Sequence, residues 1–437
     1  MALSNVHTID PVRKPRLFKA VLLVCSGNFF EMYDFMVFGF YAAYIGQAFF
    51  PAKDRITSVL AALLAFGAGF LTRPIGGIVL GAYIDSRGRR AGLIVSLILM
   101  GIGTLSIAAM PTYAQIGLAA PLFILIARLL QGFAAGAQVG AASVYLSEIA
   151  PPEKKGFYVA WQSASQQIAV TFAALIGVLA SEVLTKEQMA EFGWRIPFVI
   201  GCLLVPLIFI FRRWLEESPV FRSRRAHPRL PEIMRVFAKN AGVIAIGILM
   251  AVMTTVFFYM ITTYTATYGT AVLHLPIFSS LLATVCIGMA NFILLPTGGA
   301  LSDRVGRRPQ LIACALLGLT TAYPALLWLV SAPTFGRLLT VELWFALVYA
   351  TYNGAMIVFL TEIMPATVRT TAFSFAYSVA TAVFGGFTPA IGTALVRFEQ
   401  QRGYAASAAA PGIWLTLAAA IGLSAVLALG RRADLGN

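Results

Sequence analysis

Four charged side chains lie within long apolar stretches of the sequence: Glu31, Asp34, Arg73 and Arg128. If such a stretch crosses a bilayer, an ionised side chain at its centre costs about 2.5–3.5 kcal/mol on insertion scales, and usually faces a polar pathway or a partner. Glu31 and Asp34 are three residues apart, which puts both on one face of a helix. Two close carboxylates that are partly removed from water can bind and release a proton near neutral pH, so this pair is predicted to carry protons.

The two arginines suit the binding of an anion. A guanidinium grips a carboxylate with a rigid planar fork, so Arg73 and Arg128 are predicted to bind a polycarboxylate. At 1.5 Å per residue, Glu31, Asp34 and Arg73 lie roughly 18 to 22 Å from the polar ends of their stretches, near mid-depth. The alternative is that each arginine merely neutralises Glu31 or Asp34 and fixes helix packing, and both roles can coexist.

Uncharged polar side chains in other apolar stretches extend this predicted site. The further predicted substrate contacts are Asn28, Gln138, Gln162, Gln166, Tyr259, Tyr352 and Asn353. A single polar side chain in a membrane helix is more often used for a hydrogen bond to a neighbouring helix, which is the alternative for each of them. As a set, they are uncommon for a surface that faces lipid.

The composition indicates which elements must position these residues. Of the 437 residues, 59% are hydrophobic and 11% are charged, and the mean hydropathy is +0.82. Soluble domains have about a quarter of their residues charged, so the chain is predicted to be an all-α integral membrane protein, which excludes soluble enzymes and transcription factors. At roughly 20 residues per span, the apolar stretches predict twelve transmembrane helices. They lie at 18–28 together with 35–49, then at 57–83, 91–110, 116–147, 157–183, 194–211, 240–266, 277–301, 309–331, 336–361, 370–396 and 411–430.

The net charge of +14 is explained by topology rather than by nucleic-acid binding. Most of the 32 Lys and Arg residues fall on one side of the predicted spans, which is the cytoplasmic side by the positive-inside rule and holds both termini. The cysteines and histidines lack the spacing of metal ligands, and the histidines lie outside the apolar stretches, so neither a metal nor a cofactor is predicted. These residues are Cys25, Cys202, Cys286, Cys314, His7, His227 and His274.

The chain is predicted to consist of two related halves. GAYIDSRGRR (81–90) is repeated as GALSDRVGRR (299–308), and YLSEIAPPEKKG (145–156) as FLTEIMPATVRT (359–370), at nearly the same offset. The only long polar connection lies between them. The predicted units are therefore a six-helix bundle at 1–214, a cytoplasmic linker at 215–238 and a second bundle at 239–437, with a substrate site between the bundles near the membrane midplane.

The first repeated motif resembles the G-x-x-x-D-R-x-G-R-R loop of the major facilitator superfamily, with Ser86 in place of the usual Arg in the first copy. The resemblance implies a cytoplasmic gate in which an Asp at a helix end pairs with Arg across the gap between helices and separates as the halves rock. The gate residues that it implies are Asp85, Arg89, Asp303, Arg304, Arg307, Glu148 and Glu362.

Further strings resemble the metabolite:proton symporter branch of that superfamily, among them GNFFEMYDFMVFG (27–39), RLLQGFAAGAQ (128–138) and LEESPVF (215–221). WQSASQQ (161–167) and YNGAM (352–356) are most similar to bacterial citrate:proton symporters and their tricarballylate-transporting relatives. Gln138 stands where most of the branch has Glu. The resemblance implies a tricarboxylate as substrate, protons as coupling ion, a bacterial inner membrane and a monomer without cofactor.

The free energy needed to move an anion inward restricts the possible transport mechanisms. Moving a citrate trianion inward against about 100 mV costs roughly 7 kcal/mol, so accumulation needs cotransported cations. The sequence has no phosphate-binding loop, which favours alternating access driven by a proton gradient. The alternatives are a proton-coupled carrier of another organic acid such as a dicarboxylate, or of a zwitterionic osmolyte such as betaine or proline, and, from a different class, a transceptor or a passive channel. An enzyme is disfavoured because no nucleophile, base and orienting group recur at usable spacing.

Overall fold

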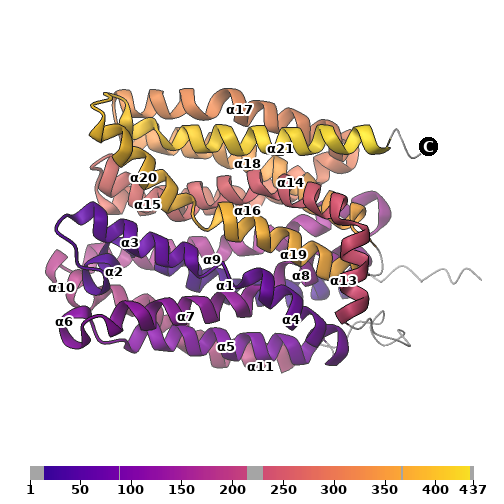
Figure 1. The fold of residues 1–437 in the computed structure, drawn as a ribbon, viewed down its shortest axis with the longest axis horizontal. Coiled ribbons are helices and arrows are strands. Elements are labelled where there is room, and N and C mark those ends of the chain that lie inside the picture. Colours follow the sequence, from indigo (N-terminus) through magenta and orange to yellow (C-terminus); the bar gives the residue numbers. More distant parts are fainter. Residues whose placement is uncertain (1–13, 88, 214–229, 366–367, 434–437) are drawn as a thin grey trace, which may run out of the picture.

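The computed structural model describes residues 14–87, 89–213, 230–365 and 368–433, and these residues form helices and turns without a β-strand. The helices run side by side along the longest axis of the molecule (Figure 1). The first half of the chain forms one bundle and the second half the other, as the colours of Figure 1 show. The predicted all-α architecture of twelve membrane-crossing units in two bundles is confirmed.

The N-terminal bundle is built from long helices, several of which are interrupted once within the membrane. Its elements are α1 (Lys14–Phe40), α2 (Ala42–Phe49), α3 (Arg55–Ala68), α4 (Arg73–Arg87), α5 (Arg89–Ala109), α6 (Tyr113–Ile116), α7 (Ala119–Ala135), α8 (Gln138–Ile149), η1 (Pro152–Lys154), α9 (Lys155–Val183), α10 (Lys186–Glu191), η2 (Gly193–Arg195) and α11 (Ile196–Arg213).

The C-terminal bundle has longer uninterrupted helices, together with two spans that pass through π-helical turns. Its elements are α13 (Leu230–Lys239), α14 (Ala241–Tyr259), η3 (Met260–Tyr264), α15 (Thr265–Thr267), η4 (Tyr268–Val272), α16 (Ile277–Val305), α17 (Arg307–Ser331), α18 (Phe335–Ile363), α19 (Arg369–Ala380), η6 (Thr381–Gly385), α20 (Thr388–Gln401), η7 (Ser407–Ala409) and α21 (Pro411–Ala433).

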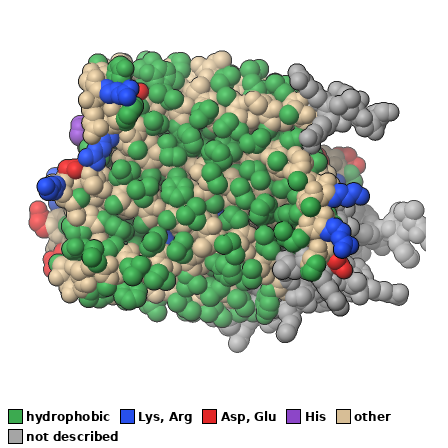
Figure 2. Space-filling model, viewed as in Figure 1, with side chains coloured by type: hydrophobic (Ala, Val, Ile, Leu, Met, Phe, Trp, Pro, Cys, Tyr) green, Lys and Arg blue, Asp and Glu red, His purple; other side chains and the backbone are tan. Residues whose placement is uncertain are grey.

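The molecule has an apolar flank and charged ends, as expected of a protein that spans a bilayer. Within the described residues, nine helices are long and apolar enough to cross a membrane, and two shorter apolar helices accompany them. Hydrophobic side chains cover the flank of the molecule, whereas charged side chains gather at its two ends (Figure 2). We call the end that carries α13 the α13 face, and the end that carries α6 and α10 the α10 face (Figure 1).

Glycines let two interrupted spans of the N-terminal bundle pack backbone to backbone. A Cβ at Gly132 on α7 would collide with the carbonyl oxygen of Gly69, where α3 ends. A Cβ at Gly136 would collide with the carbonyl oxygen of Arg73. Both spans are interrupted at these contacts, so the glycines bring the start of α4 and the end of α7 close together. Arg73 and Arg128 are positioned by these same helices.

The two bundles meet mainly along α9 and α16, with α4 against α19 and α3 against α20 on either side. The contact of α9 with α16 is close because glycines face each other: a Cβ at Gly156 would collide with the Gly299 carbonyl oxygen. Amphipathic α13 lies on the α13 face, where Phe237 packs on Phe375 of α19 at a ring distance of 5.4 Å. Residues 214–229 lie outside the described residues, so the boundaries at 214, 215, 238 and 239 stay a prediction.

Candidate substrate and proton site

The four charged residues that the sequence singled out meet in two ion pairs inside the N-terminal bundle. Arg73, the first residue of α4, places Nη2 2.6 Å from Oε1 of Glu31 on α1. Arg128 on α7 places Nη1 3.2 Å from Oδ2 of Asp34, also on α1. All four residues are at most 2% exposed. Each carboxylate therefore has an arginine of its own, which is the pairing that the sequence left open as an alternative to direct substrate binding.

Uncharged side chains close a ring around one of these pairs. The Thr104 hydroxyl on α5 donates to Oδ1 of Asp34 at 2.6 Å, and Arg128 donates to Oε1 of Gln131 at 2.6 Å. The Gln131 amide in turn donates to the Thr104 hydroxyl at 3.2 Å. A charged pair with hydrogen bonds on both sides is held in one geometry and is sensitive to the loss of any member. The sequence reasoning missed Thr104 and Gln131, although Gln131 stands one helical turn after Arg128.

Aromatic rings enclose the Arg128 guanidinium. Its Cζ lies 4.7 Å from the centroid of Phe35, 4.4 Å from that of Phe38 and 5.5 Å from that of Phe66. Ring faces attract a cation, and more strongly where water is excluded. Nε and Nη2 of Arg128 have no hydrogen-bond partner among the described residues. A guanidinium has five N–H donors, so this cation retains donors that a ligand carboxylate could use.

Buried amides with unsatisfied polar atoms are also found in both bundles. Among the described residues, several of their polar atoms have no hydrogen-bond partner: Oε1 of Gln138, Nε2 of Gln162, Nδ2 of Asn353, and both side-chain polar atoms of Gln167 and of Asn291. A buried polar group without a partner is destabilising by about 1–3 kcal/mol, and native proteins contain few of them. Their concentration on α8, α9, α16 and α18 indicates a region that receives polar ligands or water. Asn291 was missed by the sequence reasoning, since a lone Asn in an apolar span is ordinarily a helix contact.

The other predicted substrate contacts are all buried. Asn28 donates to the carbonyl oxygen of Gln162 at 3.4 Å, which ties α1 to α9, and Gln166 is 4% exposed on α9. Tyr259 on α14 reaches across to the N-terminal bundle, with its ring 5.3 Å from that of Phe70. Tyr352 instead donates its hydroxyl to the carbonyl oxygen of Met250 at 3.0 Å, which joins α18 to α14. Tyr352 is therefore used for packing within the C-terminal bundle here, and its substrate contact stays a prediction.

The predicted gate on the α13 face contains an Asp–Arg pair between neighbouring helices together with a contact between the two halves. Asp303 at the end of α16 accepts hydrogen bonds from the backbone amides of Gly156 and Phe157 at 2.8 and 3.0 Å, at the start of α9. A carboxylate is favoured at a helix N-terminus by the free amides and the helix dipole. Arg307 pairs with Asp303 at 2.7 Å within the same half, and with Glu362 at 3.5 Å.

The other predicted gate residues are Arg304, Glu148, Asp85 and Arg89. Arg304 is exposed and forms no ion pair with a described residue, and Glu148 is exposed at the end of α8. The side chains of Asp85 and Arg89 lie outside the described part of the structure. One repeat-related pair does meet, because the Thr361 hydroxyl donates to that of Ser147 at 3.2 Å, across the two halves.

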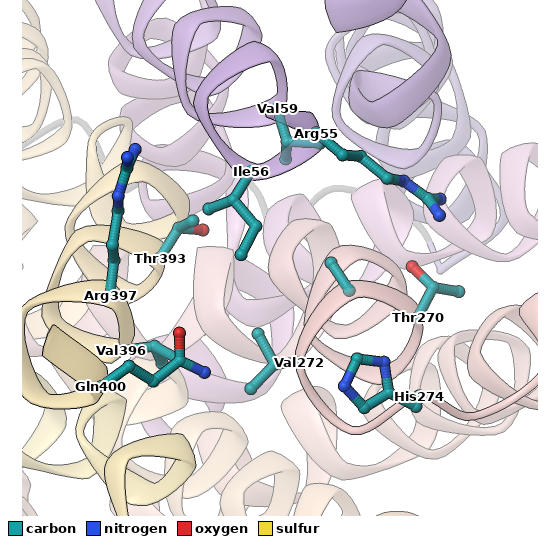
Figure 3. A pocket seen from close by; sticks show the side chains of 11 residues that line it. Arg55, Ile56, Val59, Thr270, Val272, His274, Thr393, Val396, Arg397 and Gln400 are labelled. Atoms are coloured by element: carbon teal, nitrogen blue, oxygen red, sulfur yellow. The ribbon is translucent and has the colours of Figure 1, made fainter. Parts of the chain in front are cut away.

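The α10 face has its own contact between the halves and two cavities. Arg397 on α20 lies 3.6 Å from Asp54 and donates to the Thr57 hydroxyl at 2.5 Å, which ties α20 to the start of α3. A cavity of about 640 Å³ is lined by Arg55, Lys186 and His274, among others, and a smaller one of about 180 Å³ adjoins it (Figure 3). Among the described residues, no group of three or more His, Cys, Asp or Glu side chains could hold a metal ion.

A helical protein with two bundles, buried ion pairs inside one of them and a contact between the halves at each end has the architecture of a membrane carrier. Residues 24–389 match the family model of the Major Facilitator Superfamily, and the chain belongs to that family. It is therefore a multi-pass membrane transporter and not an enzyme.

Two curated relatives are similar over almost the whole chain. A citrate-proton symporter of Salmonella typhi is 52% identical over 419 residues, covering 96% of this chain and 95% of its own. A citrate-proton symporter of Klebsiella pneumoniae is 53% identical over 413 residues, covering 94% and 92%. Among solved structures, the proton:xylose symporter XylE bound to 6-bromo-6-deoxy-D-glucose matches with a TM-score of 0.76 at 18% identity, covering 96% of both chains, which shows the fold alone.

Proposed function

We propose that this protein imports citrate or a related tricarboxylate such as tricarballylate by proton symport with alternating access. The observation that carries the proposal is the arrangement of Glu31–Arg73 and Asp34–Arg128 as buried pairs of carboxylate and guanidinium. The two citrate-proton symporters at 52 and 53% identity support the choice of substrate.

The pairs suggest how proton and substrate are coupled. While Asp34 is ionised, it occupies Nη1 of Arg128 and neutralises the cation. A proton that binds Asp34 removes this negative charge, so the guanidinium becomes an uncompensated cation in a dry site. A substrate carboxylate then replaces the charge, and a similar exchange takes place at Glu31 and Arg73. Proton binding thus raises the affinity for the anion, and by linkage the anion raises the affinity for the proton.

The orientation in the membrane, the localisation and the partners complete the proposal. The α13 face is placed in the cytoplasm with both termini, because most Lys and Arg residues of the loops belong to it. The α10 face with its cationic cavity then receives the external anion. The membrane is the bacterial inner membrane, the partners are the tricarboxylate, protons and lipid, nucleic acid is not a partner, and the carrier works as a monomer.

The test is uptake of labelled citrate into proteoliposomes under an imposed inward proton gradient, with unlabelled tricarballylate as competitor. Arg128→Lys keeps the charge but loses the planar fork, and the loss of a charge-assisted hydrogen bond, about 1.5–3 kcal/mol, corresponds to roughly a 10- to 100-fold rise in KM for citrate. Arg402→Lys, at an exposed position, is the matched control. Saturable, uncoupler-sensitive uptake supports the proposal. Absence of citrate flux from a protein that still exchanges another acid or a betaine would overturn the substrate.

A further inference from the structure

A third carboxylate is buried in the membrane-spanning part of the chain, far along the sequence from the two ion pairs. Glu342 lies on α18, within the apolar span Phe335–Ile363, and is 2% exposed. Glu31 and Asp34 each have an arginine partner, but none of the ion pairs formed by the described residues includes Glu342. Transfer of an unpaired carboxylate out of water is strongly unfavourable, whereas the neutral acid needs only hydrogen bonds.

The hydrogen bonds around Glu342 fit the neutral acid. Oγ1 of Thr265 lies 3.0 Å from Oε1 of Glu342 and 2.9 Å from the carbonyl oxygen of Ile261. A hydroxyl has one hydrogen to donate, and a carbonyl oxygen can only accept. If Glu342 carries a proton, it donates to Thr265 while Thr265 donates to Ile261, and both contacts are satisfied. If Glu342 is ionised, two acceptors compete for one hydrogen, while Oε2 has no partner among the described residues.

Among the described residues, the titratable side chain shown to interact with Glu342 is a tyrosine. Tyr268 on η4 is close enough to interact electrostatically with Glu342, and it donates its hydroxyl to the carbonyl oxygen of Ala408 at 2.7 Å. Tyr264 on η3 packs against Tyr268 at a ring distance of 5.5 Å. No cation is therefore supplied by these neighbours, and the charge of an ionised Glu342 would stay uncompensated.

The position of Glu342 connects it to the α10 face. Its partner Thr265 begins the three-residue α15 between the π-helical turns η3 and η4. Such turns interrupt the regular hydrogen-bond ladder of a helix and occur frequently at functional sites. The next residues, Ala266 and Thr267, line the cavity of about 640 Å³ on the α10 face. Glu342 thus lies one layer behind the wall of a cavity that opens between the two halves.

We propose that Glu342 is a second proton-binding site of the transport cycle, located in the C-terminal bundle and separate from the carboxylates of α1. It takes up a proton from the α10 face and carries it together with the anion. This inference rests on the proposed symport of a tricarboxylate. Each cotransported proton cancels one negative charge of the anion, so an additional proton site makes accumulation of a polyanion easier.

The test measures the proton:citrate ratio in proteoliposomes, with the membrane potential clamped at zero and the pH difference set to one unit. Glu342→Gln mimics the protonated side chain and cannot exchange a proton. It is expected to retain citrate counterflow but to accumulate citrate about tenfold less at equilibrium, because one proton fewer per cycle is a factor of ten per pH unit. Glu191→Gln, at an exposed carboxylate on α10, is the matched control and should accumulate citrate as the wild type does.

The outcomes separate the two proposals. If the wild type takes up no citrate, the proposed function fails. If the wild type is coupled and Glu342→Gln accumulates citrate to the same ratio, only the role of Glu342 is overturned. If Glu342→Gln loses counterflow as well, the deciding measurement is the number of protons taken up on citrate binding. This number is compared between purified wild type and Thr265→Val by calorimetry in buffers of different ionisation enthalpy. A changed proton number at unchanged citrate stoichiometry supports the site, and an unchanged number overturns it.

Discussion

Replacement of Asp34 by Asn tests the ion pair at the centre of the proposed coupling. The substitution keeps the size and one hydrogen-bond acceptor for Thr104, but it removes the charge that faces Arg128 at 3.2 Å. The guanidinium then remains buried among Phe35, Phe38 and Phe66 without a counter-ion. Uphill citrate uptake is expected to be strongly reduced, because no proton can bind at this position, whereas citrate counterflow is retained.

The magnitude follows from the geometry. At 3.2 Å and an effective dielectric constant of about 20, the two charges attract each other by about 5 kcal/mol. Removal of one member of a buried pair typically lowers the free energy of unfolding by about 3–5 kcal/mol, and the ring contacts offset part of this, so we expect a loss of about 3 kcal/mol. The double variant Asp34→Asn with Arg128→Gln leaves no unpaired charge, and its loss should be smaller than the sum of the two single losses.

The assay combines three readouts on the same preparations: thermal unfolding in detergent, counterflow, and uptake driven by a proton gradient. Citrate added to Asp34→Asn should stabilise it more than it stabilises the wild type, because the anion supplies the missing charge to Arg128. Citrate uptake by the wild type should fall as external pH rises, and counterflow by Asp34→Asn should lose that dependence. Uphill uptake by Asp34→Asn at wild-type level would refute Asp34 as a coupling group, and additive losses in the double variant would refute the pair as an energetic unit.

Two further predictions concern the contacts between the halves. Gly156→Val would push α9 away from the facing carbonyl of α16, so we expect closure of the α13 face to be disfavoured by about 1–3 kcal/mol. Counterflow should be slower, and thiol labelling from that face should increase. Gly336→Val is the control, because a Cβ at Gly336 has no neighbour within 4 Å. Hydrogen bonds from Thr57 and the charge of the nearby Arg397 hold the pKa of Asp54 below its usual range. Its carboxylate therefore stabilises the α3–α20 contact at neutral pH, and this contribution disappears as the pH falls through the lowered pKa. In the wild type, the yield of cross-linking between α3 and α20 should fall as the pH is lowered through this pKa. An equal fall in Asp54→Asn would exclude Asp54 as the cause.

The sequence predicted the membrane spans and the buried charges because both are local properties. A stretch of about 20 apolar residues needs no tertiary information to be recognised as a span, and a charge inside it stands out. The pairing of Glu31 with Arg73, and of Asp34 with Arg128, was not predictable in the same way. It depends on how α4 and α7 are rotated and packed against α1, which the glycine contacts near Gly69 and Gly132 decide in three dimensions.

The residues that were missed fall into two kinds. Thr104 and Gln131 are uncharged, and such residues are common in membrane helices, so only the structure shows that they complete a ring with Asp34. Glu342 was overlooked although it obeys the rule that selected Glu31 and Asp34, since it is a carboxylate inside the apolar stretch at 336–361. The partner of Asp303 could not be read from side chains at all, because it is the backbone at the start of α9.

The two bundles hold their buried carboxylates in chemically different surroundings, and this difference has a consequence for transport. At Asp34, proton and substrate are linked through Arg128, so the proton concentration should alter the apparent affinity for the anion. At Glu342, none of the ion pairs among the described residues includes the carboxylate, so its proton should mainly alter how far the anion can be accumulated and should alter the affinity for the anion less than the proton at Asp34 does. A rise in external pH is therefore expected to raise KM chiefly through Asp34 and to lower the accumulation ratio through both carboxylates. Glu342→Gln should weaken the pH dependence of the accumulation ratio while that of KM persists, whereas Asp34→Asn should remove most of the pH dependence of KM.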